Sequence, residues 1–441
     1  MSGVEIAFAS IALMLLLIYS GMHVAVALIM LSFCGVWFLR GSFDIASNMM
    51  VLAFKDAISD YLFGVVPLFV LMGLLVAVAG IGRDTFEVAA QVFRRILGGL
   101  GIATVAANAI FASITGISIA SAAVFTKVAV PEMIRHNYTP SFAVGVVAGS
   151  SVLGMLLPPS LLFILYGVLT EQSVGSLFIA GIIPGILLSL VYCAGIFAMG
   201  KWWPNFIGGP RPGTAQASEP VELMGYGEMA NKLFPIVLLV TLVLGGIYGG
   251  YFTPTEAGAA GALGALVISV AKRRLTWASF WQVLVQTGHT TSSICFLIIG
   301  ASLYSRMLAM SGMPGWLGSF VVESGMGATG IILALMVVVI LLGTILDSAS
   351  IMLLTLPIAV PILMGMNVDM IWLGVLTVIA VEIGLLTPPF GIAVFVVKAT
   401  LGPDSKITLN EIFAGALPFA VMMLFVLILV FLFPWLAVAL V

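Results

Sequence analysis

The stretch Gly154-Met155-Leu156-Leu157-Pro158-Pro159 returns 230 positions later as Gly384-Leu385-Leu386-Thr387-Pro388-Pro389. Both copies lie in apolar segments. Proline lacks a backbone N–H and its ring clashes with the preceding helical turn, so a helix breaks at each Pro-Pro pair. Within lipid, a broken helix is tolerated only where protein or a water-filled cavity satisfies the freed carbonyl groups. Two such breaks in two halves of one chain therefore predict one central site.

The composition places this site in a membrane. Of the 441 residues, 62% are hydrophobic and 8% are charged, whereas a soluble domain carries about 25% charged residues. Several apolar runs approach the roughly 20 residues that cross a bilayer as a helix. These runs cover residues 6–19, 24–39, 62–79, 178–199, 234–247, 331–346 and 417–433. The composition excludes a soluble protein, and the net charge of −2 implies no nucleic-acid partner.

The second half of the chain repeats the first. At the same offset, Pro131 matches Pro361 and Ser118 matches Ser348. Each half contains a segment with a polar tip whose two apolar arms are too short to cross, which predicts a re-entrant helical hairpin. The first repeat is predicted at 1–200, with scaffold helices 1–80, arm helix 83–97, hairpin 102–134, broken helix 141–170 and span 178–199. A Pro- and Gly-rich linker at 201–231 leads to the second repeat at 232–441, with scaffold helices 232–311, arm helix 313–324, hairpin 329–364, broken helix 369–400 and span 410–434.

The basic residues orient the two halves. If the N-terminus lies outside and each half crosses an odd number of times, 13 of the 16 Lys and Arg residues fall on the cytoplasmic side. The exceptions are Arg40, Lys55 and Arg306. An odd number of crossings also inverts the second repeat. The prediction is an all-α polytopic membrane protein with two inverted repeats, which is the architecture of secondary transporters.

The hairpin tips and the Pro-Pro breaks are expected to face each other in each half. Unwound carbonyls and half-helix C-termini attract cations, and half-helix N-termini attract anions. Hydroxyl oxygens around Gly116 come from Thr115, Ser118 and Ser121, with Ser150 and Ser151 near the break. Around Gly343 they come from Thr344 and Ser348, with Asp347 beside them and Thr387 at the break. Neutral oxygens suit a Na⁺ that must bind and leave, although Ser, Thr and Gly also simply pack helices together.

Charged residues inside apolar segments are further candidates. Asp347 at its tip and Glu382 before its break can serve a cation, a proton or a buried hydrogen-bond network. For Lys127 and Arg306, a structural ion pair or snorkelling is favoured over a contact with substrate carboxylates. For Glu256, a helix N-cap role is favoured. The Cys and His residues lack the spacing of a metal site, so no cofactor is expected beyond a coupling Na⁺.

Together these motifs resemble the large membrane subunit of tripartite ATP-independent periplasmic (TRAP) transporters, over nearly the whole chain. The residues that carry the resemblance are Leu157-Pro158-Pro159-Ser160, Leu346-Asp347, Leu386-Thr387-Pro388-Pro389-Phe390-Gly391, Gly-Gly-Tyr-Phe-Thr-Pro-Thr-Glu-Ala at 249–257 and Phe-Ile-Ala-Gly-Ile-Ile-Pro-Gly at 178–185. The resemblance implies Na⁺-coupled uptake of carboxylate solutes across the bacterial inner membrane, with both termini periplasmic. A periplasmic binding protein would deliver the substrate, and a small four-helix membrane subunit would brace the large one.

The resemblance also implies an elevator-type fold, in which hairpins and broken helices move against a scaffold of the other spans and the arm helices. By matching position, the first Na⁺ site uses Gly116, Ser118, Ser150, Ser151 and Gly154. The second uses Gly343, Asp347, Ser348, Thr387 and Gly391. The substrate would bind between them, near Thr115, Ser121, Pro158, Pro159, Ser350, Pro388 and Pro389.

The chain departs from the family pattern at three places. Ile117 stands in a tip that usually reads Gly-Ser-Ser, Ser151-Val152 replaces a common Gly-Thr pair, and Ala393 stands where Asn is frequent. The first two departures fall in the first site, so the second keeps more of the family's polar ligands.

Two other functions compete with this interpretation. A stand-alone ion-coupled organic anion transporter of a related elevator fold would need no binding protein. A membrane-embedded enzyme would need a clustered nucleophile and base or a metal set, and the sequence displays neither. Because the large-subunit pattern begins almost at the first residue, we expect the small subunit to be a separate chain.

Overall fold

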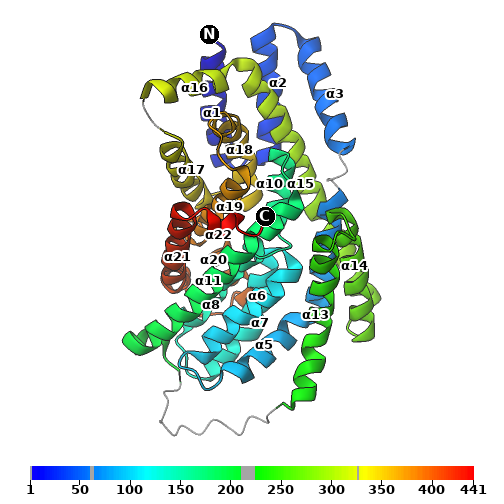
Figure 1. Cartoon of the computed structure of the whole chain (residues 1–441), viewed down its shortest axis with the longest axis vertical. Coiled ribbons are helices and arrows are strands. Elements are labelled where there is room, and N and C mark those ends of the chain that lie inside the picture. The colour runs from blue at the N-terminus through cyan, green and yellow to red at the C-terminus, as the bar shows by residue number, and fades with distance from the viewer. Residues whose placement is uncertain (1, 60–63, 210–223, 325–326) are drawn as a thin grey trace.

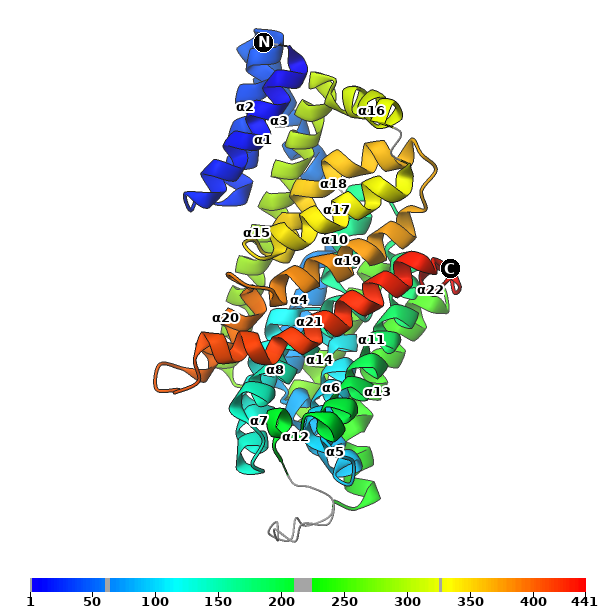
Figure 2. The same cartoon turned by 90° about the vertical axis from the view of Figure 1, so that its left-hand side faces the viewer.

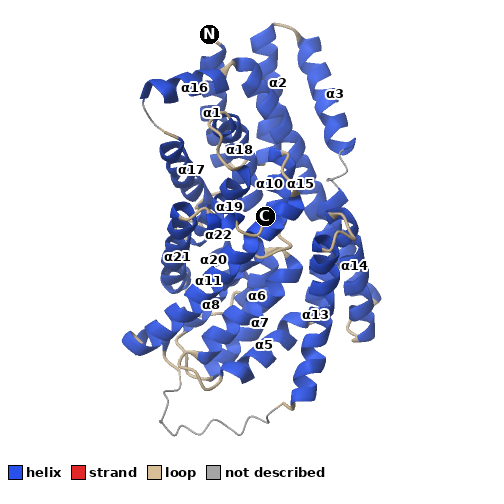
Figure 3. Ribbon diagram, in the orientation of Figure 1, coloured by secondary structure: helices blue, strands red, loops and turns tan. Residues whose placement is uncertain are grey.

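The computed structural model describes residues 2–59, 64–209, 224–324 and 327–441. These residues form helices α1 to α22 and one isolated bridge between Tyr138 and Gly208, with no strand among them (Figure 3). The middle of the predicted linker and the first two residues of the apolar run 62–79 lie outside the described residues.

The described helices of the first half run from α1 to α12. They are α1 (Gly3–Tyr19), α2 (Val24–Arg40), α3 (Phe43–Ser59), α4 (Val65–Val78), α5 (Ile81–Phe93), α6 (Gly99–Thr115), α7 (Ser118–Arg135), α8 (Pro140–Ser151), α9 (Leu153–Leu156), α10 (Leu161–Thr170), α11 (Val174–Trp202) and α12 (Pro204–Ile207). The second half contains α13 (Tyr226–Tyr248), α14 (Pro254–Ala271), α15 (Trp277–Ser311), α16 (Met313–Ser324), α17 (Ala328–Gly343), α18 (Ser348–Met364), α19 (Met370–Leu386), α20 (Ile392–Leu401), α21 (Leu409–Leu432) and α22 (Trp435–Val438).

Many helices start at a side-chain cap that the sequence encodes. Thr139 accepts a hydrogen bond from the Phe142 amide, and Pro140 follows as the first helical residue of α8. Ser160 accepts from the Phe163 amide directly after the first Pro-Pro break, so α10 restarts there. Reciprocal capping boxes begin α14, α15 and α21. These caps pair some of the free amide groups at each helix start and let the chain restart helices after breaks and loops.

Two helices are longer than the sequence pattern indicated. The polar residues that follow Arg40 predict only a short amphipathic piece, whereas α3 has 17 residues. The apolar pattern predicts a span only from residue 290, whereas α15 begins at Trp277 and has 35 residues. Polar residues at 286–291 interrupt the apolar run, but Thr276 and Ser279 form a capping box that starts the helix earlier. Polarity alone therefore misplaced the beginning of this element.

Figures 1 and 2 show an elongated molecule. Helices α1 to α4 pack with α14 and α15, and α13 packs on α14, whereas α7 to α11 pack with α18 to α21. Contacts of α15 with α18 and of α4 with α6 join these two sets of helices. The last span of each half, α11 or α21, was expected in the scaffold. Both instead pack on hairpin and broken-helix elements. Small residues allow this, because Gly181 of α11 lies against Leu156 and Phe163, and Gly415 of α21 lies against Ser141 of α8.

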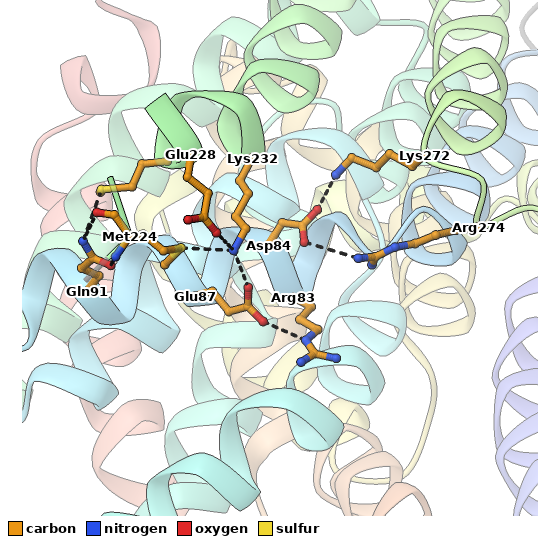
Figure 4. A network of polar contacts seen from close by, with 10 residues as sticks. Arg83, Asp84, Glu87, Gln91, Met224, Glu228, Lys232, Lys272 and Arg274 are labelled. Atoms are coloured by element: carbon orange, nitrogen blue, oxygen red, sulfur yellow. Dashed lines mark hydrogen bonds and ion pairs between the residues drawn. The ribbon is translucent and has the colours of Figure 1, made fainter. Parts of the chain in front are cut away.

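Helix α5, in the region predicted as the first arm helix, is held by polar contacts to α13 and α14 (Figure 4). Asp84 pairs with Lys272 and lies 3.7 Å from the Arg274 guanidinium. Glu87 pairs with Lys232 at 2.9 Å and with Arg83 at 2.8 Å. Farther along α5, the Gln91 carboxamide donates to the Met224 carbonyl at 2.8 Å and accepts from its amide at 2.9 Å. These contacts fix α5 on helices more than 130 positions away in the sequence.

Candidate functional site

The first hairpin tip lies against the first Pro-Pro break. Helix α6 ends at Gly116, whose φ of 63° is left-handed, and α7 starts at Ser118. The Gly116 carbonyl accepts a hydrogen bond from the Leu161 amide at 3.2 Å. A Cβ at Gly116 would lie 2.5 Å from the Pro159 carbonyl oxygen, so only glycine fits here. The tip and the break are therefore joined by direct backbone contact.

The second tip and break meet in a similar way. The Thr344 carbonyl accepts from the Phe390 amide at 3.2 Å and from the Gly391 amide at 3.3 Å. Gly343 and Gly384 pack back to back, because a Cβ added at Gly343 would lie 2.7 Å from the Gly384 Cα. Helix α17 ends at Gly343, and α19 ends just before Thr387. In both halves the Pro-Pro peptide bond is cis.

The ends of four helices converge at the first tip. Helices α6 and α9 end there at Thr115 and Leu156, and α7 and α10 begin there. Helix ends carry unpaired carbonyls or amides and the partial charges of the helix dipole, so one place can hold both a cation and an anion. A narrow recess beside this tip is lined by Phe69, Val70, Thr115, Gly116, Ile117, Pro159, Ser160 and Leu161.

The hydroxyl groups of the predicted sites mostly donate to their own helices. Thr115 donates to the Phe111 carbonyl at 3.1 Å, Ser151 to Ala148 at 2.8 Å and Thr387 to Ile383 at 2.7 Å. A hydroxyl oxygen has two lone pairs besides its proton, so these groups remain able to coordinate a cation. The Ser121 hydroxyl is buried and has no partner among the described residues.

A buried amide that the sequence analysis overlooked also reaches the first site. The Asn108 carboxamide on α6 donates to the Ser150 hydroxyl at 2.6 Å, and its own oxygen has no partner in the described chain. Both residues are fully buried. An amide within an apolar hairpin arm is itself a signal, because polar groups inside a membrane are commonly functional. The amide of Asn108 in the first hairpin could therefore have been recognised as a candidate from the sequence alone.

Two acidic residues lie at the second site in different roles. Asp347 caps α18, where its carboxylate accepts from the Ser350 amide at 3.1 Å and also from the Ser350 hydroxyl. Glu382 is only 1% exposed and accepts from the Ser348 hydroxyl at 3.4 Å. The two breaks also differ in exposure, since Pro158 and Pro159 are buried whereas Pro388 and Pro389 are exposed.

The remaining candidate charges have no bond to a tip or break in the described contacts. Glu256 forms a capping box at the start of α14, where its carboxylate accepts from the Thr253 amide at 2.8 Å. Arg306 pairs with Asp56 at 2.7 Å. Lys127 is exposed on α7. The favoured structural interpretation therefore matches the observed contacts of Glu256 and Arg306.

The paired tips and breaks, set among long apolar helices, define a multi-pass membrane protein of the secondary-transporter class. Five described helices are long and apolar enough to cross a membrane, and two bent helix pairs add up to two more. One bend of 41° lies at the first Pro-Pro break, between α9 and α10.

Residues 11–436 match the family model described as "Tripartite ATP-independent periplasmic transporter, DctM component", and the chain belongs to this family. The predicted family is thus confirmed, and the chain is a transporter permease rather than an enzyme.

Two curated relatives and one solved structure extend this comparison. The C4-dicarboxylate TRAP transporter large permease protein DctM of Pseudomonas aeruginosa is 34% identical over 85% of each chain. The sialic acid TRAP transporter large permease protein SiaM of Vibrio cholerae is 30% identical over 95% of this chain and 94% of its own. The YdaH transporter of Alcanivorax borkumensis has a similar fold, with a TM-score of 0.57 and 13% identity over 90% of this chain and 89% of its own.

Proposed function

We propose that the chain is the large subunit of a sodium-coupled transporter that imports an organic acid delivered by a periplasmic binding protein. The observation that carries this proposal is the contact between tip and break in both halves. Each contact brings together backbone carbonyls and hydroxyl oxygens, and the place is buried in the first half and partly exposed in the second. Such neutral oxygens are the ligands that suit a Na⁺ which must be released after transport.

The carboxylate substrate is proposed to bind between the two tips, near the Pro-Pro pairs and the hydroxyls of Thr115, Ser121 and Ser350. The start of α7 and the restart of α10 supply amide groups for an anion. The two relatives are named as a C4-dicarboxylate permease and a sialic acid permease, and both names describe carboxylate solutes. These names support an organic acid, such as a dicarboxylate, as the substrate class.

The transport movement is proposed to be of the elevator type. Helices α6 to α11 and α17 to α21 would move together, because the last spans pack on the hairpins and broken helices. Helices α1 to α4 and α13 to α15 would stay fixed, braced by a small four-helix subunit. The chain would lie in the bacterial inner membrane with both termini periplasmic, as the distribution of basic residues favours.

Uptake into proteoliposomes tests this function. The chain is reconstituted with the small subunit and the binding protein encoded beside it, after the binding protein has been screened for ligands by thermal shift. An inward Na⁺ gradient is expected to drive accumulation of the labelled acid. Unchanged uptake with K⁺ in place of Na⁺ would refute sodium coupling. Transport by the purified chain alone would instead favour a stand-alone organic anion transporter.

A further inference from the structure

The second half contains a buried carboxyl group without a basic partner. Glu382 of α19 is 1% exposed. One of its oxygens accepts from the Ser348 hydroxyl at 3.4 Å, and the other has no hydrogen-bond partner among the described residues. No ion pair in the described chain includes this carboxyl group. Because an uncompensated buried charge is strongly unfavourable, this carboxyl group needs either a proton or a positive group that the protein itself does not supply.

A second unpartnered polar group lies near this carboxyl. Tyr192 of α11 is fully buried, and its hydroxyl has no hydrogen-bond partner in the part of the chain described. Helix α11, which carries Tyr192, packs against α19, which carries Glu382. Native proteins rarely leave such buried groups unsatisfied, so both side chains are unusual polar positions inside apolar helices.

The internal repeat shows that this charge belongs to one site only. At the 230-residue offset, Ser348 matches Ser118, but Glu382 matches Val152. In the first half the broken helix instead offers the neutral Ser150 hydroxyl, bound to Asn108 at 2.6 Å. In the first half, two neutral side chains, Asn108 and Ser150, link the hairpin to the broken helix. In the second half the link joins a neutral and an acidic side chain, Ser348 and Glu382.

Ser348 connects the carboxyl to the second tip. It is the first residue of α18, directly after Asp347. When the Ser348 hydroxyl donates a hydrogen bond to Glu382, the lone pairs of its oxygen are left to face a cation at the tip. The negative charge then lies one side chain away from that cation, in a place shielded from water, where opposite charges attract strongly.

We propose that Glu382 supplies a negative charge to the second Na⁺ site in addition to that of Asp347, and that it reaches the site through Ser348. Glu382 acts here as a positioning residue, and the second site binds Na⁺ more tightly than the uncharged first site. This inference rests on the proposed sodium-coupled function and assigns a role to one residue within it.

The test measures Na⁺ binding without transport. The complete purified complex is unfolded thermally at increasing NaCl, with choline chloride holding the ionic strength constant. A ligand that binds only the folded state raises the unfolding midpoint as its concentration passes the dissociation constant. Glu382→Gln keeps the size and a hydrogen-bond acceptor but removes the charge. The Na⁺ concentration for half-maximal stabilisation is expected to rise about tenfold, as for loss of a charge-assisted interaction.

Thr377→Val on the same helix is the matched control. Thr377 is fully buried and donates to the Leu373 carbonyl of its own helix at 2.8 Å. Its substitution is expected to leave the half-maximal Na⁺ concentration unchanged. An unchanged value in Glu382→Gln would overturn the inference and leave the proposed function standing. A wild-type complex that Na⁺ does not stabilise at all would contradict the proposed function itself.

Glu382→Asp keeps the test decisive if the Gln variant does not assemble. Aspartate retains the charge on a side chain one methylene shorter. Assembly with a half-maximal Na⁺ concentration within about threefold of wild type would support the charge assignment. An Asp variant that also fails to assemble, or that binds Na⁺ tenfold more weakly, would overturn it.

Discussion

Gly116 is the residue at which the first tip leaves no room for a side chain. Its φ is 63°, and an added Cβ would lie 2.5 Å from the Pro159 carbonyl oxygen. Gly116→Ala is therefore expected to push the tip off the break and to destabilise the protein by at least about 1–2 kcal/mol, the usual penalty for a left-handed L-residue. Thermal unfolding of the purified complex measures the loss, and Na⁺-driven uptake is expected to fall with it.

Gly245→Ala is the control for this substitution. Gly245 lies inside α13, and the nearest atom to an added Cβ is the Thr241 methyl carbon at 3.7 Å. In this helical position alanine is expected to be neutral or stabilising by up to about 1 kcal/mol. Equal unfolding midpoints for the two variants would contradict the close contact at the tip.

Hydroxyl oxygens at the two sites are expected to bind Na⁺ directly. Thr387→Ala and Ser118→Ala each remove one oxygen and leave the backbone of tip and break in place. Each is expected to weaken Na⁺ binding about tenfold, because a ligand oxygen contributes roughly as much as a hydrogen bond to a charged group. The measurement is the Na⁺ dependence of uptake by the reconstituted complex.

Thr400→Ala serves as the matched control for both variants. Thr400 donates to the Val396 carbonyl on α20 at 2.7 Å, as Thr387 does to Ile383. Its loss is expected to leave the Na⁺ dependence unchanged. If Thr387→Ala and Ser118→Ala behave like this control, the assignment of the Na⁺ sites is wrong.

Some residues of the candidate site could be recognised from the sequence and others could not, for reasons that lie in their chemistry. Proline pairs and tip glycines are local signals, because their backbone restrictions hold in any context. Asn108 and Tyr192 were missed, since their importance depends on burial and on partners elsewhere in the chain. Ser150, the partner of Asn108, is 42 positions away. A sequence read without contacts cannot separate such residues from ordinary polar positions in a helix.

Among the elements, α5 depends on a buried ion pair with α14. The Asp84 side chain is 9% exposed and the Lys272 side chain 21%. Asp84→Asn would leave Lys272 partly buried without its counter-charge. Breaking such a pair from one side costs about 3–5 kcal/mol when fully buried, and the partial exposure here lowers the expected loss to about 2 kcal/mol. Backbone hydrogen exchange in α5 is the measurement, and its rate is expected to rise.

Arg83→Gln on the same helix provides the comparison. Arg83 pairs with Glu87 at 2.8 Å, but its side chain is 67% exposed. An exposed pair contributes at most about 1 kcal/mol, so exchange in α5 is expected to change little. Faster exchange in Arg83→Gln than in Asp84→Asn would argue against this network as the anchor of α5.

Packing between elements was the part least accessible from sequence. The apolar pattern predicted that 178–199 and 410–434 span the membrane, and α11 and α21 fill these regions. It did not reveal that both pack on the hairpins and broken helices. A helix that is apolar on all sides gives no periodicity to indicate which face meets protein and which meets lipid. The close approach of Gly145 to Gly415 settles this for α8 and α21.

At the scale of the whole molecule, the fold class followed from the repeat. An all-α multi-pass membrane protein was predicted from composition, breaks and hairpins, and the family match confirms it. The relation between the two halves was visible because Pro-Pro pairs and tips kept one register over 230 positions. Orientation in the membrane rests on the basic residues alone, so it remains a prediction that calls for a direct test.

Labelling single cysteines from one side of the membrane tests this orientation. The α2–α3 connection and the end of α11 lie toward opposite ends of the elongated molecule (Figures 1 and 2). In a variant whose Cys34, Cys193 and Cys295 are replaced, Arg40→Cys is expected to react with a membrane-impermeant maleimide on intact spheroplasts. Arg40 is exposed, which gives the reagent access.

Lys201→Cys and Lys406→Cys probe the opposite side. Both positions are exposed, and both belong to the basic majority predicted to be cytoplasmic. They are expected to react only after the spheroplasts are lysed. Because one follows the last span of the first repeat and the other precedes the last span of the second, the two positions lie on the same side only if the second repeat is inverted. Labelling of Lys201→Cys on intact spheroplasts would show that the predicted orientation is wrong. Opposite accessibility of the two positions would contradict the inverted repeat.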